Sequence, residues 1–327
     1  MTTPLVSVLM PVRDEAPYLA EALASLSEQT LEDFEVIVVD DGSTDESPEI
    51  ALEHTRRDAR FRVVRQAARG VVAALELARA GARGRYVARM DGDDVALPQR
   101  LALQAEALES EGLDACGSRI AYFGAVRDGA RRYERWVNSL VTAESAARDV
   151  FVECPIPHPA LFARREAVSY RDCGWPEDYD LVLRLWASGA RFRNVEEVVV
   201  RWREHAGRAS RTDGAYSLDA FVRCKVHHLR VAFGCDSALV WGAGPVGKSF
   251  AREVRRQGSD VVAFVEVDPR KIGREIYGIP VVSVDEAPRF AEAFALGAVA
   301  GEEARARIRE MVAAQGRRDG VDFVAVA

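Results

Sequence analysis

The segment "RYVARMDGDDVALPQRL" (residues 85–101) joins an apolar run to a cluster of acids. The run ends at Met90, and Asp91, Asp93 and Asp94 follow directly. A short apolar run of this kind predicts a buried strand, as in parallel sheets. Like charges this close repel one another, so the cluster is favourable where a divalent cation binds it; the alternative is a solvated acidic turn.

A second apolar run, "FEVIVVDDGSTDES" (34–47), also contains acids at its end, Asp40 and Asp41, and "LVSVLM" (5–10) precedes it. Strands that alternate with helical stretches predict an α/β fold with a mainly parallel sheet. Ligands of such sheets bind beyond the carboxyl ends of the strands, so we expect the two acidic strand ends to converge on one crevice. Carboxylates there suit Mg²⁺ or Mn²⁺, which complete their coordination with substrate phosphates.

Composition limits the classes of function. The chain has 327 residues, which predicts about two domains, and its net charge of −7 gives no basic field for nucleic acid. Its five cysteines form no CxxC pair, which fits a reducing cytoplasm. The N-terminus is typical of a strand rather than a signal peptide, and no window approaches about 18 apolar residues, so we expect no membrane span.

The strand–helix pattern restarts near residue 237. "VWGAGPVG" carries Gly242, Gly244 and Gly247 between a strand and a helix, and Glu266 ends the next strand. This spacing is typical of a nucleotide-binding turn, in which the backbone approaches a phosphate and the acid binds a ribose. One half of a dinucleotide fold is present, so a module that binds a protein partner, or nothing, is the alternative.

The polar, glycine-bounded segment "GRASRTDG" (207–214) is the best linker candidate. We therefore expect a first domain over residues 1–213, a helical linker over 214–235 and a second, Rossmann-like α/β domain over 236–327. That second domain would be an appended module. Its segment "FVEVDPRKIGREIYGIPVVS" (264–283) resembles the small Rossmann-like domain fused to some sugar acyltransferases and some bacterial glycosyltransferases.

Several motifs in order, from "VSVLMPVRDE" through "VIVVDDGSTDES" to "RMDGDD", resemble the inverting family 2 glycosyltransferases of the GT-A fold, a Rossmann-like fold of nucleotide-diphospho-sugar transferases. The resemblance covers residues 5–205. It implies that Pro11, Val12 and Arg13 lie along the nucleotide base and ribose. It also implies that Asp41 contacts the base.

The same resemblance assigns the acids at the end of the 85–90 strand. Asp91 would bind the nucleotide sugar and the metal, with Asp93 as the direct metal ligand. "RWREH" resembles the segment after the last core strand, where Arg203 and His205 are candidates to reach the diphosphate, and His205 joins the metal set; an exposed strand-end pair is the alternative. "PEDYDLVLR" resembles the family's ED motif, by which Asp178 is the general base; a helix-start charge is the alternative reading of Asp178.

The sequence thus predicts an enzyme that moves a sugar from a nucleotide-diphosphate donor to a hydroxyl acceptor, with Mn²⁺ or Mg²⁺ as cofactor. A UDP-sugar is the favoured donor, and a glycan, lipid-linked or peptide hydroxyl is the acceptor. The expected location is the cytoplasm, including peripheral association with the inner face of the membrane. The alternatives are a nucleotide- or sugar-binding regulatory protein with an inactive transferase domain, and a nucleotidyltransferase.

Overall fold

The computed structural model describes residues 3–208 and 213–327. They form two compact units that interleave along the chain. Within the described ranges, unit 1 comprises residues 3–147, 155–173 and 188–208, and unit 2 comprises residues 148–154, 174–187 and 213–327. The expected linker candidate over 207–214 falls partly outside the described residues, and the expected boundaries at 213 and 236 stay a prediction.

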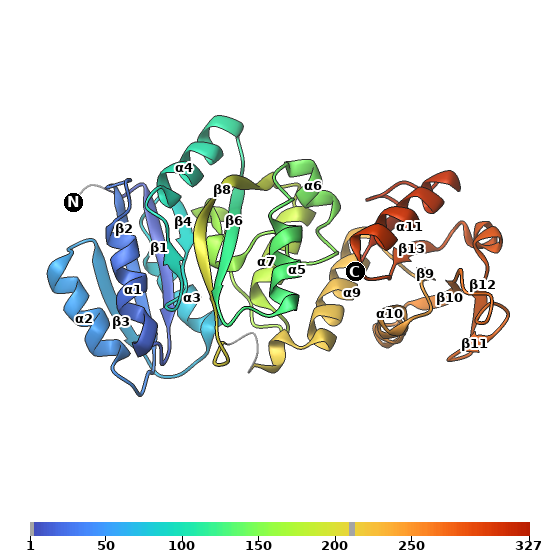
Figure 1. Ribbon diagram of the computed structural model, residues 1–327, viewed down its shortest axis with the longest axis horizontal. Helices are drawn as coiled ribbons and strands as arrows, with labels where there is room; N and C mark the ends of the chain where they lie inside the picture. The colour runs from blue at the N-terminus through green and yellow to red at the C-terminus, as the bar shows by residue number, and fades with distance from the viewer. Residues whose placement is uncertain (1–2, 209–212) are drawn as a thin grey trace. The chain divides into compact units, whose positions relative to one another are not determined.

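Unit 1 is built on an eight-stranded mixed sheet with the strand order β3-β2-β1-β4-β7-β6-β8-β5 (Figure 1). Strands β3, β2, β1 and β4 run parallel, whereas β7 lies antiparallel between β4 and β6. The strands are β1 Val6–Val12, β2 Phe34–Asp41, β3 Phe61–Gln66, β4 Tyr86–Arg89, β5 Val95–Ala96, β6 Ala115–Gly124, β7 Phe162–Arg164 and β8 Phe192–Glu204. The expected α/β fold is therefore confirmed, and the sheet expected to be mainly parallel is mixed, with antiparallel pairing at β7 and β5.

Helices cover this sheet where the sequence places apolar residues at helical spacing. In α1, Pro17 lies in the first turn, and Leu19, Leu23 and Leu26 are buried, as expected. Helix α1 packs against α2, and α3 packs against β1 and β2. The helices are α1 Ala16–Ser27, α2 Ser47–Arg57, α3 Val71–Gly81, α4 Arg100–Glu111, α5 Asp128–Val137 and α6 Ala143–Arg148.

The register of the parallel strands explains why the acids gather at one edge. Val12 of β1 lies opposite Asp40 of β2, and Leu9 of β1 lies opposite Arg89 of β4. The three strands therefore run side by side in the same direction, and the segments that follow them share the carboxyl edge of the sheet. The apolar runs themselves are buried on both faces, as expected of central parallel strands.

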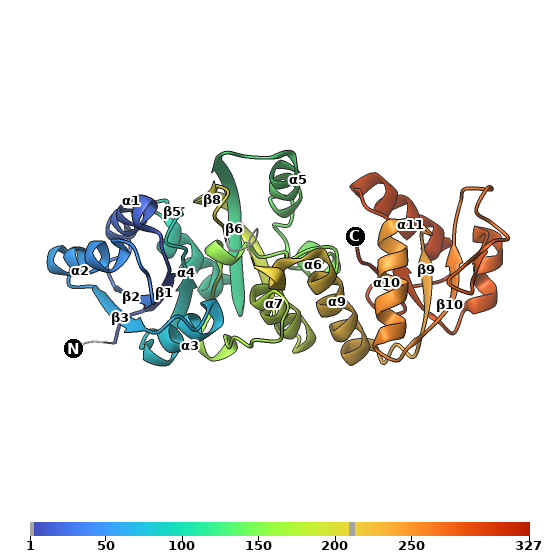
Figure 2. The ribbon, with the colours of Figure 1, turned by 90° about the horizontal axis from the view of Figure 1, so that it is seen from below.

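Unit 2 contains a six-stranded sheet with the order β11-β12-β10-β9-β13-β14. Figure 2 shows its strands β9 and β10 beside helix α10. Its strands pair in parallel, whereas β11 pairs with β12 in the antiparallel sense. The strands are β9 Ser237–Trp241, β10 Asp260–Val265, β11 Glu275–Ile276, β12 Ile279–Val282, β13 Phe294–Gly297 and β14 Phe323–Ala325. Its helices are α7 Glu177–Ala187, α9 Leu218–Phe233, α10 Pro245–Arg256 and α11 Glu302–Ala314. The expected Rossmann-like second domain is confirmed.

Helix α7 belongs to unit 2, although residues 188–208 of unit 1 lie between it and α9 in the sequence. The short segment 148–154 belongs to unit 2 as well. None of the helices in the described parts of the chain combines the length and the apolar character that a membrane span requires.

Candidate functional site

The loop after β4 presents the three acids in different surroundings. Oδ2 of Asp93 lies 2.8 Å from Nε2 of His205, which directly follows β8. Asp94 is fully buried, and its Oδ1 accepts a hydrogen bond of 2.7 Å from the backbone N–H of Arg203. Its Oδ2 is also buried and has no hydrogen-bond partner within the described ranges. Asp91 forms an ion pair with the buried guanidinium of Arg89.

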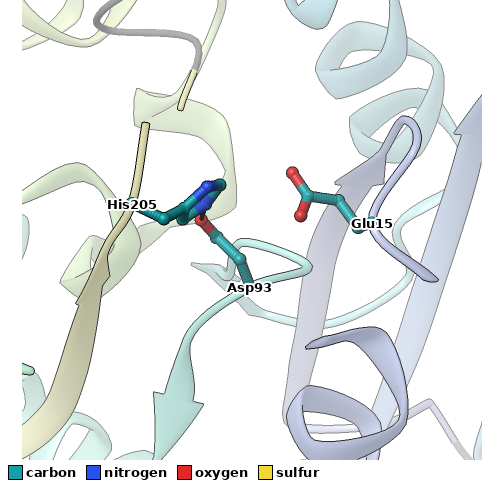
Figure 3. Close-up of side chains that lie close together, drawn as sticks. All are labelled: Glu15, Asp93 and His205. Atoms are coloured by element: carbon teal, nitrogen blue, oxygen red, sulfur yellow. Dashed lines mark hydrogen bonds and ion pairs between the residues drawn. The ribbon is translucent and has the colours of Figure 1, made fainter. Parts of the chain in front are cut away.

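Glu15, which lies between β1 and α1, joins this loop. One ligand atom each from Glu15, Asp93 and His205 lies within 4.8 Å of the other two, and the three side chains point toward one another (Figure 3). The backbone N–H of Glu15 donates to Oγ of Ser47 at 2.8 Å, which fixes the turn between β1 and α1. We call Glu15, Asp93 and His205 the carboxylate–imidazole cluster.

The surroundings of the cluster disfavour negative charge on its carboxylates. Burial, followed by repulsion from Asp93 and Asp91, raises the pKa of Glu15 to about 8. Burial and Asp91 also raise the pKa of Asp93, and these effects outweigh the opposing effect of His205. Carboxylates and an imidazole are ligands that divalent cations such as Mn²⁺ accept, and a cation would favour the charged carboxylates and the neutral imidazole. The residues present therefore fit a divalent cation.

Arg203 holds the acidic loop in place. Its Nε donates to the backbone oxygen of Asp93 at 2.7 Å, and its guanidinium carbon lies 4.6 Å from the ring centre of Tyr18. The ring of His205 lies 5.0 Å from that of Tyr18. The end of β8 and the start of α1 thus jointly support the loop.

The residues expected along the nucleotide lie at the ends of β1 and β2. Pro11 and Val12 are the last residues of β1, and Arg13 follows, with Nη1 3.9 Å from Oδ2 of Asp41. Asp41 is buried and accepts hydrogen bonds from the backbone N–H groups of Arg69 and Gly70, at 2.7 and 2.8 Å. The structure brings Arg13 and Asp41 together, and Asp41 also fixes the loop before α3.

Asp178 lies in the first turn of α7, within unit 2. It is partly exposed, whereas its neighbours Glu177, Tyr179 and Asp180 are buried. One of its oxygens accepts a hydrogen bond of 2.7 Å from the backbone N–H of Tyr179. A partly exposed carboxylate at the start of a helix can accept a proton from a ligand, as well as complement the helix dipole.

The glycine turn of unit 2 contains glycines that the backbone requires and one glycine beside open space. A Cβ on Gly247 would lie 1.8 Å from the backbone oxygen of Gly242, and Gly242 itself has a φ of +109°, so the strand–helix turn requires glycine at both positions. A Cβ on Gly244 would meet no atom of the described chain within 4 Å. Oε2 of Glu266 accepts from the N–H of Ala243 at 3.3 Å.

A cavity of about 300 Å³ lies beside this turn. It is lined by Gly242, Glu266 and apolar side chains at and beyond the strand ends, together with residues of α11 that include Glu303, Arg307, Ile308 and Met311. The structure therefore brings Gly242 and Glu266 of the predicted second site to one cavity. Apolar walls with a few polar groups are typical of small-molecule sites.

Glu15 is not among the metal residues predicted from the sequence. The signal was available, because Glu15 follows a strand that ends at the same edge as β2 and β4. The sequence does not show that Glu15 and His205 lie close together, because the two residues are far apart along the chain and meet only in the folded structure.

Comparison with known proteins defines the class. The family profile described as Glycosyl transferase family 2 matches residues 7–171, and the profile described as CoA binding domain matches residues 236–318. The chain therefore belongs to the family 2 glycosyltransferases.

Particular relatives and structures agree with this class. The chain is 29% identical over 241 residues to a protein of Bacillus subtilis (strain 168) described as uncharacterized glycosyltransferase EpsJ, covering 70% of each chain. It is similar in fold to TarS of S. aureus in complex with UDP-GlcNAc, with a TM-score of 0.56, 17% identity and coverage of 77% and 72%. Mannosyltransferase PcManGT of Pyrobaculum calidifontis, in complex with GDP-Man and Mn²⁺, gives a TM-score of 0.51 at 20% identity, with coverage of 79% and 70%. Unit 1 thus has a GT-A-type fold, as expected.

Proposed function

We propose that this protein is a metal-dependent, inverting glycosyltransferase that moves a hexosyl group from a nucleotide-diphosphate sugar to a hydroxyl acceptor. The carboxylate–imidazole cluster at the carboxyl edge of the unit 1 sheet carries this proposal. Transfer of a sugar from a diphosphate needs compensation of the charge that develops on the leaving group, and this edge is where parallel sheets bind ligands.

Asp93 and His205 would hold the cation, with Asp91 and Glu15 as further candidates. A bound cation would neutralise charge on the departing diphosphate. The ion pair of Asp91 with Arg89 favours Glu15 over Asp91 as the additional direct ligand. Burial, followed by repulsion from Asp93 and Asp91, raises the pKa of Asp94, so this buried acid favours its neutral form and adds little charge beside the cation.

The donor would lie along Pro11, Val12, Arg13 and Asp41, with Asp91 near the sugar or ribose. A UDP-sugar is the favoured donor. A nucleotide sugar as donor is supported by the fold, which is shared with TarS bound to UDP-GlcNAc and with PcManGT bound to GDP-Man, and the TarS complex agrees with a UDP-sugar. Arg13 is exposed and lies beside the buried Asp41, so its guanidinium can reach a ligand at this edge.

Asp178 would act as the general base. Its carboxylate accepts the proton of the acceptor hydroxyl while that oxygen attacks the anomeric carbon and the bond from this carbon to the diphosphate oxygen breaks. A single displacement of this kind inverts the configuration at the anomeric carbon. The acceptor would be a glycan, lipid-linked or peptide hydroxyl in surface polysaccharide, glycolipid or glycoconjugate synthesis, in the cytoplasm or at the inner face of the membrane.

Gly242, Gly244, Gly247 and Glu266 would form a second site, for a nucleotide-type ligand. The cavity beside the turn supports this proposal, as does the match of residues 236–318 to a family described as CoA binding domain. No atom of the described chain lies within 4 Å of the position that a Cβ on Gly244 would take, so a phosphate has room to approach the backbone there.

Titration with Mn²⁺ tests the cluster. Asp93→Asn should abolish Mn²⁺-dependent binding of UDP. Glu15→Gln should weaken Mn²⁺ binding by roughly tenfold or more, because loss even of a group that only supports a metal ligand has an effect of this size. Electron paramagnetic resonance of free Mn²⁺ and calorimetry with UDP measure both effects. Asp14→Asn is the matched control, since it removes a neighbouring charge outside the cluster. Unchanged UDP binding in Asp93→Asn would refute the metal site.

Donor specificity is tested by hydrolysis of UDP-glucose, UDP-galactose, UDP-N-acetylglucosamine and GDP-mannose with Mn²⁺. Release of nucleoside diphosphate supports the transferase, whereas release of pyrophosphate supports a nucleotidyltransferase. Binding of nucleotide sugars without any turnover, with or without acceptors, supports an inactive regulatory domain.

A further inference from the structure

The first turn of α7 is held by buried contacts within unit 2. Both carboxylate oxygens of Glu177 lie within hydrogen-bond distance of the hydroxyl of Tyr216, at 2.8 and 2.6 Å. Oδ1 of Asp180 lies 3.0 Å from Nε2 of His228 and 3.2 Å from Nε1 of Trp175. These contacts fix the residues directly before and shortly after Asp178.

The two carboxyl groups in these contacts are buried, so protein donors take the place of water around them. Glu177 is 2% exposed and Asp180 is fully buried, so each carboxylate depends on its protein donors. With a proton on Nε2, His228 donates to Asp180, and Nε of Arg184 donates to the other oxygen of Asp180 at 2.8 Å. A carboxylate held in this way has one orientation, and so does the backbone turn that carries it.

The residues that hold α7 are themselves fixed to the second sheet through α9. Nζ of Lys225 donates to the backbone oxygens of Val152 and Val326, at 2.7 and 3.1 Å. The ring of Phe233 lies 4.6 Å from that of Phe294, the first residue of β13. Helix α9 therefore connects the first turn of α7 to the Rossmann-like sheet by continuous packing.

We propose that Tyr216 and His228 are positioning residues for Asp178, so that the C-terminal region takes part in catalysis by holding the general base. This inference rests on the proposed role of Asp178. Asp178 is the partly exposed carboxylate between two buried ones, and Tyr216 and His228 reach the buried pair. Loss of either donor would let the turn shift, and displacement of a base by about 1 Å costs roughly 100-fold in rate.

The test uses the full chain with three changes. Tyr216→Phe removes only the hydroxyl, His228→Ala removes the imidazole, and His228→Gln keeps a side-chain N–H donor for Asp180. Tyr277→Phe, at an exposed tyrosine of the same unit, is the matched control. Turnover and KM are measured on the four nucleotide sugars above with Mn²⁺, and thermal unfolding verifies that each variant is folded.

We expect Tyr216→Phe and His228→Ala to lower kcat by roughly 10- to 100-fold with donor KM within about twofold, because the donor residues lie in unit 1. His228→Gln should recover most of kcat. Wild-type kcat in both folded variants would overturn the inference, as would a rise in KM without a fall in kcat.

Asp178→Asn, measured alongside, separates the two proposals. If Asp178→Asn is inactive while Tyr216→Phe and His228→Ala have wild-type turnover, the positioning role fails and the base stands. If Asp178→Asn retains wild-type turnover, the proposed base is itself wrong.

Discussion

Three nearly adjacent acids differ because each meets a different partner. Asp91 is paired with Arg89, Asp94 accepts from the backbone of Arg203, and Asp93 faces His205. The three chemically identical side chains thus lie in three different environments. Their closeness along the sequence does not determine which of them faces Glu15. The same holds around Asp178, where exposure differs from one residue to the next.

The prediction for a single residue concerns Asp178. Asp178→Asn keeps the shape of the side chain but removes its ability to accept a proton as a carboxylate does. We expect donor affinity to be unchanged and kcat to fall by roughly two to four orders of magnitude. Calorimetric titration with UDP and steady-state rates measure the two quantities. A parallel loss of affinity and rate would indicate a binding or structural role instead.

Strand ends serve two purposes in this fold. The acids that end β2 accept hydrogen bonds from two loops: Asp40 from Ser43 in the loop after β2, and Asp41 from Arg69 and Gly70 in the loop between β3 and α3. The acids after β4 face the carboxylate–imidazole cluster or belong to it. Helix ends are used in a similar way, since Asp58, at the end of α2, receives hydrogen bonds from Ser27 of α1 and from Arg60.

This helix end predicts a pH dependence of stability. Hydrogen bonds from Arg60 lower the pKa of Asp58 to about 2. An acid whose pKa is lower in the folded state stabilises the protein above its unfolded pKa, about 3.9, and loses that contribution as the pH falls through the folded value. Asp58→Asn should therefore cost about 1 kcal/mol at about pH 7, after allowance for solvent screening, and progressively less below about pH 4.

Urea unfolding of both proteins between about pH 3 and about pH 7 measures this difference. Glu49→Gln, at an exposed acid of the same helix, is the control with the same change of charge. A difference between wild type and Asp58→Asn that stays constant over this range would exclude the ion pair as its source.

On the scale of the whole molecule, two compact units interleave along one chain. Segments 148–154 and 174–187 pack with residues 213–327 rather than with the sequence that surrounds them. The sequence favours an appended module that could be removed near residue 213. The contacts of α7 favour the opposite, because removal would take away Tyr216, a partner of Glu177, and His228, a partner of Asp180.

Hydrogen exchange in graded denaturant tests this organisation in the full chain. Amides of α7 should exchange with the same dependence on denaturant as those of α9 and β9, because contiguous packed units open together. Amides of α4, a helix of unit 1, should follow β1 instead. Exchange of α7 in step with β1 and α4 would show that α7 opens with unit 1.

The sequence by itself determined the local elements and the order of the motifs. The apolar runs of β1, β2 and β4, the acids that end or follow β2 and β4, and the glycine turn near residue 242 are each encoded within a few residues. Only the tertiary structure decided which of these groups meet. Glu177 and Tyr216 are 39 residues apart, and Asp180 and His228 are 48 apart, so local periodicity carries no information on either contact. Glu15 enters the cluster for the same reason, because long-range packing places strand ends side by side.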